Sequence, residues 1–176
     1  PLFRLDSVAY TGFPSVADSL LRRTRRRRLL NKGDAFSVVN LSGEQTRIEQ
    51  LLRENGYYFF SAPYVAFRAD TFQRKNHVQL RVQPADGIPD RVKHPWYIGR
   101  THITVREKAG DALTGKFSLR DFTFNHSGRR IPLKPYVWRE AIVHRRGDLY
   151  RLRHQNTTIE KLNTLGVFSQ LDVSYV

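Results

Sequence analysis

The sequence predicts an α+β fold built from two tandem copies of one small module. The first observation is a repeated pattern, because residues 32–36 read KGDAF and residues 146–150 read RGDLY. The second is that an Ile-Glu helix pattern follows each Gly-Asp pair, at 46–56 and at 157–166, and ends at a glycine. The third is a segment rich in proline and glycine, residues 84–95, between the copies. Internal repeats of this kind indicate architecture better than single motifs do.

The first module opens with a strand and a long helix. Residues 3–10 alternate between apolar and polar side chains with one phase slip, which is typical of a strand. A helix is expected over about 16–30, where Ser15 and Asp18 have the spacing of a capping box. Gly33 can take the left-handed conformation that ends a helix. The expected apolar side of this helix consists of Val16, Leu20, Leu21 and Leu29.

A second helix is expected from Ser42, where Gln45 completes a capping box, to Gly56. Its apolar residues at helical spacing are Ile48, Leu51 and Leu52. A cluster of aromatic residues follows, and consists of Tyr57, Tyr58, Phe59, Phe60, Tyr64 and Phe67. We expect this cluster to be core between helix and sheet, with alternate members buried and one or two exposed.

Two strands complete the first module. Residues 64–69 form the first, and residues 77–83 form the second, which alternates cleanly between apolar and polar side chains. Residues 70–76 connect them. The first module therefore covers residues 1–84, and residues 85–95 are expected to be a linker.

The second module, residues 96–176, begins with a strand over 97–107. An insertion over 108–131 follows, and its alternating aromatic residues predict an extra hairpin. A short helix is expected over 135–143, since the proline at its start suits the first helical turn.

The end of the second module repeats the end of the first only in part. Thr157 and Glu160 have capping-box spacing, and Gly166 is expected to end the helix. The apolar residues of that helix are Ile159, Leu162 and Leu165. Residues 171–175 alternate as a strand, and no final strand follows. Because of this truncation and the absence of methionine, we expect the chain to be a piece of a longer protein.

The order of these elements resembles the POTRA (polypeptide-transport-associated) domain, strand-helix-helix-strand-strand. The second copy carries the resemblance best, through Gly147-Asp148-Leu149-Tyr150, Ile159, Leu162, Leu165, Gly166-Val167-Phe168, Leu171, Val173 and Tyr175. The first copy carries it through Gly33-Asp34-Ala35-Phe36, Ile48, Leu52 and Gly56-Tyr57-Tyr58-Phe59-Phe60. Together the two copies cover nearly the whole chain.

The resemblance implies a BamA/TamA-type outer-membrane assembly or translocation protein (surface antigen family) of a Gram-negative bacterium. In that family, POTRA domains lie in the periplasm, bind unfolded outer-membrane proteins or assembly-complex subunits without catalysis, and lead into a membrane β-barrel. Binding is expected by β-augmentation, in which an extended client adds a strand to an exposed sheet edge. The resemblance places that edge at Tyr64, Val65, Ala66, Phe67 and Arg68.

The net charge of +14 permits an anionic lipid surface, an acidic protein or nucleic acid as partner. The sharpest charge feature is a basic patch of six arginines within seven residues, Arg22, Arg23, Arg25, Arg26, Arg27 and Arg28. On the expected helix they wrap around the axis, and they form a solvated face or bind an anionic lipid surface, an acidic partner or nucleic acid. A basic nucleic-acid-binding protein of two small α+β domains is the alternative function, although no recognisable nucleic-acid-binding motif is present.

Several kinds of chemistry are absent from the sequence. Zero cysteines exclude disulfides and thiolate catalysis. Residues 110–116 match most of a phosphate-binding loop, but Phe117 stands where the metal-binding hydroxyl belongs, so a hairpin turn is expected. The six histidines lack metal-ligand spacing and are expected on the surface or in strands: His77, His94, His102, His126, His144 and His154. We expect no metal and no cofactor. A hydrolase with an unfamiliar arrangement is the third hypothesis, and it requires a nucleophile and a base in one pocket.

Overall fold

The structure, a computed structural model, describes residues 3–71 and 75–175. The chain divides into two compact units, Pro1–Pro95 and Trp96–Val176, and each is described by itself. Part of the expected connection over 70–76 lies outside the described residues. The α+β architecture of two small modules is confirmed, with one three-stranded sheet in each unit.

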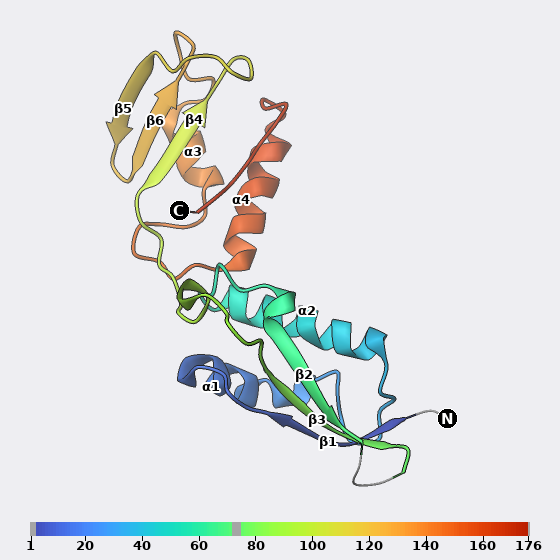
Figure 1. The fold of residues 1–176 in the computed structure, drawn as a ribbon. Helices are drawn as coiled ribbons and strands as arrows, with labels where there is room; N and C mark the ends of the chain where they lie inside the picture. Colours follow the sequence, from blue (N-terminus) through green and yellow to red (C-terminus); the bar gives the residue numbers. More distant parts are fainter. Residues whose placement is uncertain (1–2, 72–74, 176) are drawn as a thin grey trace. The chain divides into compact units, whose positions relative to one another are not determined.

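The sheet of the first unit contains β1 (Arg4–Tyr10), β2 (Val65–Asp70) and β3 (His77–Pro84) in the order β1-β3-β2. The central β3 pairs in parallel with β1 and antiparallel with β2, as Figure 1 shows. Its alternation is confirmed, because Val78, Leu80 and Val82 are buried. The phase slip in the first strand corresponds to a register shift between Leu5 and Ser7.

The first helix is shorter than expected. Helix α1 covers only Ser15–Arg23, and a 3-10 turn, η1 (Arg25–Arg27), follows it. A continued α-helix would bring like charges together at i,i+3 and i,i+4 spacing, which disfavours the extension to residue 30. Val16 and Leu29 are half or more exposed, so neither lies on a buried side as expected. The expected capping box is also wrong, because Pro14 is the N-cap and makes no side-chain bond.

The second helix is longer than expected. Helix α2 covers Val38–Glu54, and the hydroxyl of Ser37, not of Ser42, accepts from the Asn40 N–H. The predicted end is confirmed, because Gly56 has a φ of 101° and the Tyr57 N–H bonds to the Leu52 carbonyl.

The core of the first unit lies between one face of the sheet and the two helices. Residues of the sheet, of α1 and of α2 meet there, including Leu5, Leu21, Ile48 and Leu52. Val92 joins the same core from η3 (Asp90–Val92), within the expected linker. Residues 85–95 therefore pack as part of the first unit.

The second sheet repeats the arrangement of the first with different segments. It contains β4 (Thr101–Val105), β5 (Gly115–Leu119) and β6 (Phe122–His126) in the order β4-β6-β5. The central β6 pairs in parallel with β4 and antiparallel with β5, as β3 does with β1 and β2. The hairpin over 108–131 thus fills the two places that the last two strands fill in the first unit.

Two helices pack beside this sheet, α3 (Pro135–Ala141) and α4 (Leu152–Thr164). The expected start of α4 at Thr157 is wrong, because the helix begins five residues earlier behind Arg151. Residues 171–175 form no strand, so that prediction is also wrong. The sheet has the order β4-β6-β5, and residues 171–175 pair with neither of its edge strands.

The Gly-Asp repeat makes the same turn in both units. The Asp34 carboxylate accepts from the Asn31 N–H at 2.7 Å, and the Asp148 carboxylate accepts from the Arg145 N–H at 2.7 Å. Gly33 and Gly147 have φ angles of 93° and 89°, which favour glycine. These residues therefore fix the same kind of turn in each unit.

Candidate functional site

The outer edge of β2 is the candidate site, because β2 is the last strand of the first sheet. The Tyr64 carbonyl accepts from the Ala85 N–H, so Tyr64 directs its main chain toward β3. In an antiparallel pair this direction alternates from residue to residue. Val65, Phe67 and Ala69 therefore direct their N–H and C=O groups away from β3, toward the outer edge.

The first of these three residues is already satisfied. The Val65 N–H bonds to the Ala62 carbonyl in the 3-10 turn η2 (Ala62–Tyr64), and the Val65 carbonyl accepts from Gln45 Nε2 of α2 at 2.8 Å. Within residues 3–71 and 75–175, no hydrogen bond occupies the outward main-chain groups of Phe67 and Ala69. The open part of the edge is thus Phe67 to Ala69.

The expected edge residues do not all lie in this strand. Tyr64 lies in η2, so the strand begins one residue later than expected. Ala66 and Arg68 direct their main chains toward β3, and the Arg68 side chain is 3.2 Å from Asp86. Ala69, which the sequence reasoning did not single out as a site residue, extends the open edge. The alternation of β3 shows which of its side chains are buried. Which β2 main-chain groups face outward depends on how β2 pairs with β3, and only the structure shows that.

The basic patch runs from the end of α1 through the 3-10 turn η1 to Arg28. Arg22 lies on α1 and pairs with Asp18 at 2.8 Å. The next members of the patch are exposed: Arg23, Arg25, Arg26 and Arg27. Arg28 turns back and stacks over the Tyr10 ring at 4.1 Å. The patch is therefore held at both ends and exposed in the middle.

A buried carboxylate holds the end of the patch. Glu44 on α2 is 0% exposed, and its Oε1 accepts from the Tyr10 hydroxyl at 2.7 Å and from Arg47 Nη2 at 2.6 Å. Its Oε2 accepts from the Leu29 N–H at 2.9 Å and from Arg47 Nε at 2.9 Å. Burial, and then the bond to Glu44, raises the pKa of the Tyr10 phenol. Every donor around Glu44 thus suits an ionised carboxylate.

The sequence reasoning missed this network. Glu44 lies four residues before Ile48, so it faces the core, but a glutamate in a helix pattern is normally exposed. Its position one turn before a buried isoleucine was the signal that could have found it.

The aromatic cluster after α2 is core, as expected, but its burial differs from the expected alternation. Tyr57 and Phe60 are buried, and the other four members are half-buried, so none is exposed. The two buried rings are three residues apart because the chain turns after Gly56. Burial of every second ring would need a strand there.

The structure brings no metal-ligating group together in the part of the chain that it describes. His144 is 6% exposed, so the expectation of surface or strand histidines is wrong for that residue. Residues 108–111 make a third Asp turn, because the Asp111 carboxylate accepts from the Lys108 N–H at 2.9 Å. Strand β5 follows this turn, and no helix N-terminus is there to hold phosphate. Among the described residues, no helix has the length and hydropathy to cross a membrane.

No protein-family model matches the sequence, and no curated protein matches it. Among solved structures, the chain is similar to BamA POTRA3-5 of Haemophilus influenzae, at 13% identity and a TM-score of 0.53. That likeness covers 97% of this chain and 53% of the other, so the chain spans about half the length of that structure.

Two further structures are similar at lower TM-scores. The N-terminal domain of Omp85 from Thermosynechococcus elongatus has 10% identity and a TM-score of 0.31, covering 99% of this chain and 90% of that one. POTRA1-3 of the periplasmic domain of Omp85 from Anabaena has 9% identity and a TM-score of 0.29, covering 99% and 89%. The likeness to BamA POTRA3-5 agrees with the strand-helix-helix-strand-strand order of the first unit. The chain has a POTRA-type fold.

Proposed function

We propose that this chain is a non-enzymatic client-binding scaffold, part of an outer-membrane β-barrel assembly or translocation protein in the periplasm. An extended segment of an unfolded outer-membrane protein, or of an assembly subunit, adds to the outer edge of β2. The observation that carries the proposal is the pair of open residues on that edge, Phe67 and Ala69. The POTRA-type fold supports this proposal. A parent chain that continues into a membrane barrel is part of the same proposal.

The open edge offers two N–H and two C=O groups in one line. Each main-chain bond to a client contributes about 1 kcal/mol net, so affinity is modest and little sequence is selected. Val65 closes one end of this line because Gln45 caps its carbonyl. The client therefore meets a short edge, which suits transient binding.

The test is a titration of the isotopically labelled chain with an extended peptide from an outer-membrane protein. Ala69→Pro removes the outward N–H while leaving the ladder to β3 intact, since proline is tolerated where a strand N–H faces outward. We expect about fivefold weaker binding for this variant. Ala69→Val is the matched control, because it enlarges the same side chain and keeps the N–H. Equal affinity of the two variants, or no peptide-induced shift at Phe67 and Ala69, contradicts the proposal.

The exposed middle of the basic patch supports a second contact, with an anionic lipid surface. Each basic residue near such a surface contributes about 1 kcal/mol. Replacement of Arg25, Arg26 and Arg27 by glutamine is expected to abolish sedimentation with vesicles that contain anionic lipid. Unchanged sedimentation, or a stronger preference for duplex DNA than for the vesicles, contradicts this contact.

A further inference from the structure

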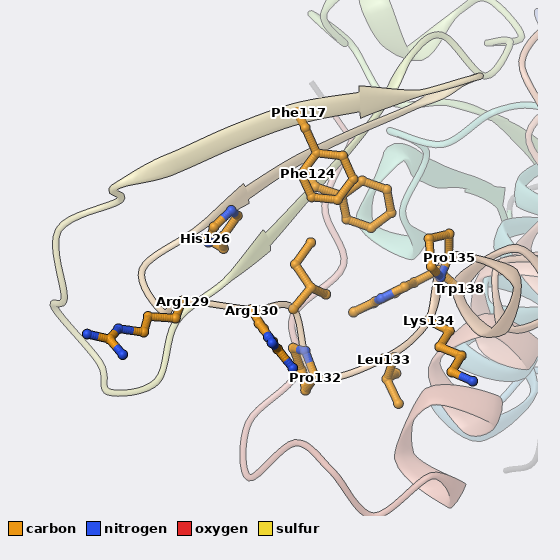
Figure 2. Close-up of a pocket in the computed structure, with 11 residues that line it drawn as sticks. Phe117, Phe124, His126, Arg129, Arg130, Pro132, Leu133, Lys134, Pro135 and Trp138 are labelled. Atoms are coloured by element: carbon orange, nitrogen blue, oxygen red, sulfur yellow. The ribbon is translucent and has the colours of Figure 1, made fainter.

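A hollow of about 400 Å³ lies in the second unit, between the β5–β6 hairpin and the start of α3. Figure 2 shows its lining residues, which come from one continuous stretch of chain. Its volume is within the range of small-molecule sites, about 300–1,000 Å³. The lining combines apolar and aromatic side chains with cations, and it includes no carboxylate.

Aromatic rings form one wall of the hollow. Phe117 and Phe124 stack with their centroids 4.8 Å apart, and Trp138 meets Phe124 edge-on at 6.0 Å. The Phe117 side chain belongs to this wall and is 40% exposed, so part of its surface remains available to a ligand. Such a wall suits another aromatic ring, because offset and edge-on ring pairs are favourable beyond their buried area.

One polar group in the hollow has no partner. Trp138 is 4% exposed, and its Nε1 is buried without a hydrogen-bond partner among the residues that the structure describes. Figure 2 shows the Trp138 side chain extending from α3 into the hollow, below Phe124. A buried indole N–H usually donates to an acceptor, so an oxygen atom of a ligand would supply the acceptor that this N–H lacks.

Cations supply the charge on the opposite side. Arg130 and Lys134 line the hollow from the loop that precedes α3. In Figure 2 the Arg130 side chain lies beside Pro132, whereas Arg129 points away from the hollow. An arginine and an unpaired N–H that line one hollow can together recognise a carboxylate.

The loop that carries Arg130 is held in place. His126 Nδ1 lies 2.7 Å from the Gly128 carbonyl, and the Glu107 side chain lies over Gly128. The His126 ring also lies over Gly115 of β5, where an added Cβ would come within 2.2 Å of it. These contacts hold the Gly128 end of the loop against the hairpin.

We propose that this hollow binds an aromatic carboxylate. The ligand ring lies against the exposed part of Phe117, which stacks on the buried Phe124, and one carboxylate oxygen accepts from Trp138 Nε1 while Arg130 pairs with the charge. This site is in the second unit and does not depend on the edge of β2. Its failure would therefore leave the proposed function untouched, and the reverse also holds.

The probe is N-acetyl-phenylalanine, titrated into the full chain at pH 7 and followed by NMR of the indole N–H signals. The chain has two tryptophans, so Trp96 is an internal control for Trp138. We expect the Trp138 signal to shift and the Trp96 signal to stay. The amide of the same compound is expected to bind about tenfold more weakly, because it lacks the charge.

Two further ligands identify the source of the chemistry. 3-Phenylpropionate tests a free aromatic acid, and binding comparable to N-acetyl-phenylalanine shows that the peptide group is not required. Octanoate tests an acyl chain of similar charge. Tighter binding of octanoate than of either aromatic acid overturns the proposal, and so does equal binding of the neutral amide.

Variants complete the test. Arg130→Gln is expected to weaken N-acetyl-phenylalanine about tenfold, whereas Arg146→Gln, an exposed charge in a distant turn of the same unit, is expected to have no effect. Phe117→Leu keeps an apolar residue but removes the ring, and it is expected to weaken binding severalfold. Equal effects of the two arginine variants, or no shift of Trp138 at millimolar ligand, overturn the proposal.

Discussion

Replacement of Glu44 by glutamine is expected to destabilise the first unit strongly. The carboxylate is fully buried and accepts from Tyr10, Leu29 and Arg47. A glutamine has nearly the same volume, but its NH₂ group faces donors where Glu44 presents an acceptor. The variant therefore leaves Arg47 without its counter-charge, with the Arg47 side chain only 15% exposed.

Breaking a buried ion pair by removing one partner costs about 3–5 kcal/mol. Because Arg47 keeps some contact with water, the lower end, about 3 kcal/mol, is expected for Glu44→Gln. Tyr10→Phe removes one donor and leaves Arg47 on the same oxygen, so its expected cost is about 1 kcal/mol. With a urea m-value of about 1.5 kcal/mol/M, the midpoint of Glu44→Gln falls by about 2 M.

The assay separates the two units by their chromophores. Both tryptophans, Trp96 and Trp138, belong to the second unit, so tryptophan fluorescence follows that unit alone, whereas far-UV circular dichroism follows both. Glu44→Gln is expected to lower the dichroism transition and leave the fluorescence transition in place. A midpoint change below about 0.5 M, or an equal change in both transitions, would refute the reasoning.

Three further predictions concern single side chains. Gly115→Ala is expected to cost the second unit about 1–3 kcal/mol through collision with the His126 ring, and the added change His126→Ala should restore most of it in fluorescence-detected urea unfolding. Burial lowers the pKa of His144 in the folded chain, so the unfolded chain binds a proton at this imidazole more readily. The free energy of unfolding should therefore fall as the pH drops below about 6.5, and His144→Leu should flatten this dependence of the urea midpoint. Asp34→Ala and Asp148→Ala should each cost about 1 kcal/mol in their own unit, and a shift of the fluorescence midpoint by Asp34→Ala would contradict the assignment of the turns.

Local features could be predicted from the sequence because they depend on neighbouring residues. Gly33, Gly56, Gly147 and Gly166 all have the positive φ that their positions after helices or in turns require. The clean alternation of β3 likewise follows from burial of one face of the sheet.

Helix boundaries were harder to predict, for identifiable reasons. The start of α2 was missed because Val38 and Val39 are 77% and 80% exposed, so the first turn lacks the expected apolar face. The predicted first helix is too long because the apolar pattern continues to Leu29. Repulsion between the arginines limits the helix to Arg23.

The arrangement of the second sheet and the open part of the β2 edge depend on contacts between distant segments. The sequence predicted a hairpin over 108–131, but not that β6 would lie beside β4 as β3 lies beside β1. The resemblance to POTRA domains implied a five-residue edge, whereas the Gln45 bond to Val65 reduces the open part to Phe67 through Ala69. Neither the pairing of β6 with β4 nor the bond from Gln45 to Val65 can be predicted from the local sequence pattern.

Hydrogen exchange of the β2 amides, with and without an outer-membrane-protein peptide, tests the central claim most directly. In the free chain, the N–H groups of Phe67 and Ala69 should exchange faster than those of Ala66 and Arg68, which face β3. The account predicts that peptide binding slows exchange at Phe67 and Ala69 selectively. Saturating peptide that leaves both rates unchanged, or slows all four amides equally, would contradict strand addition at this edge.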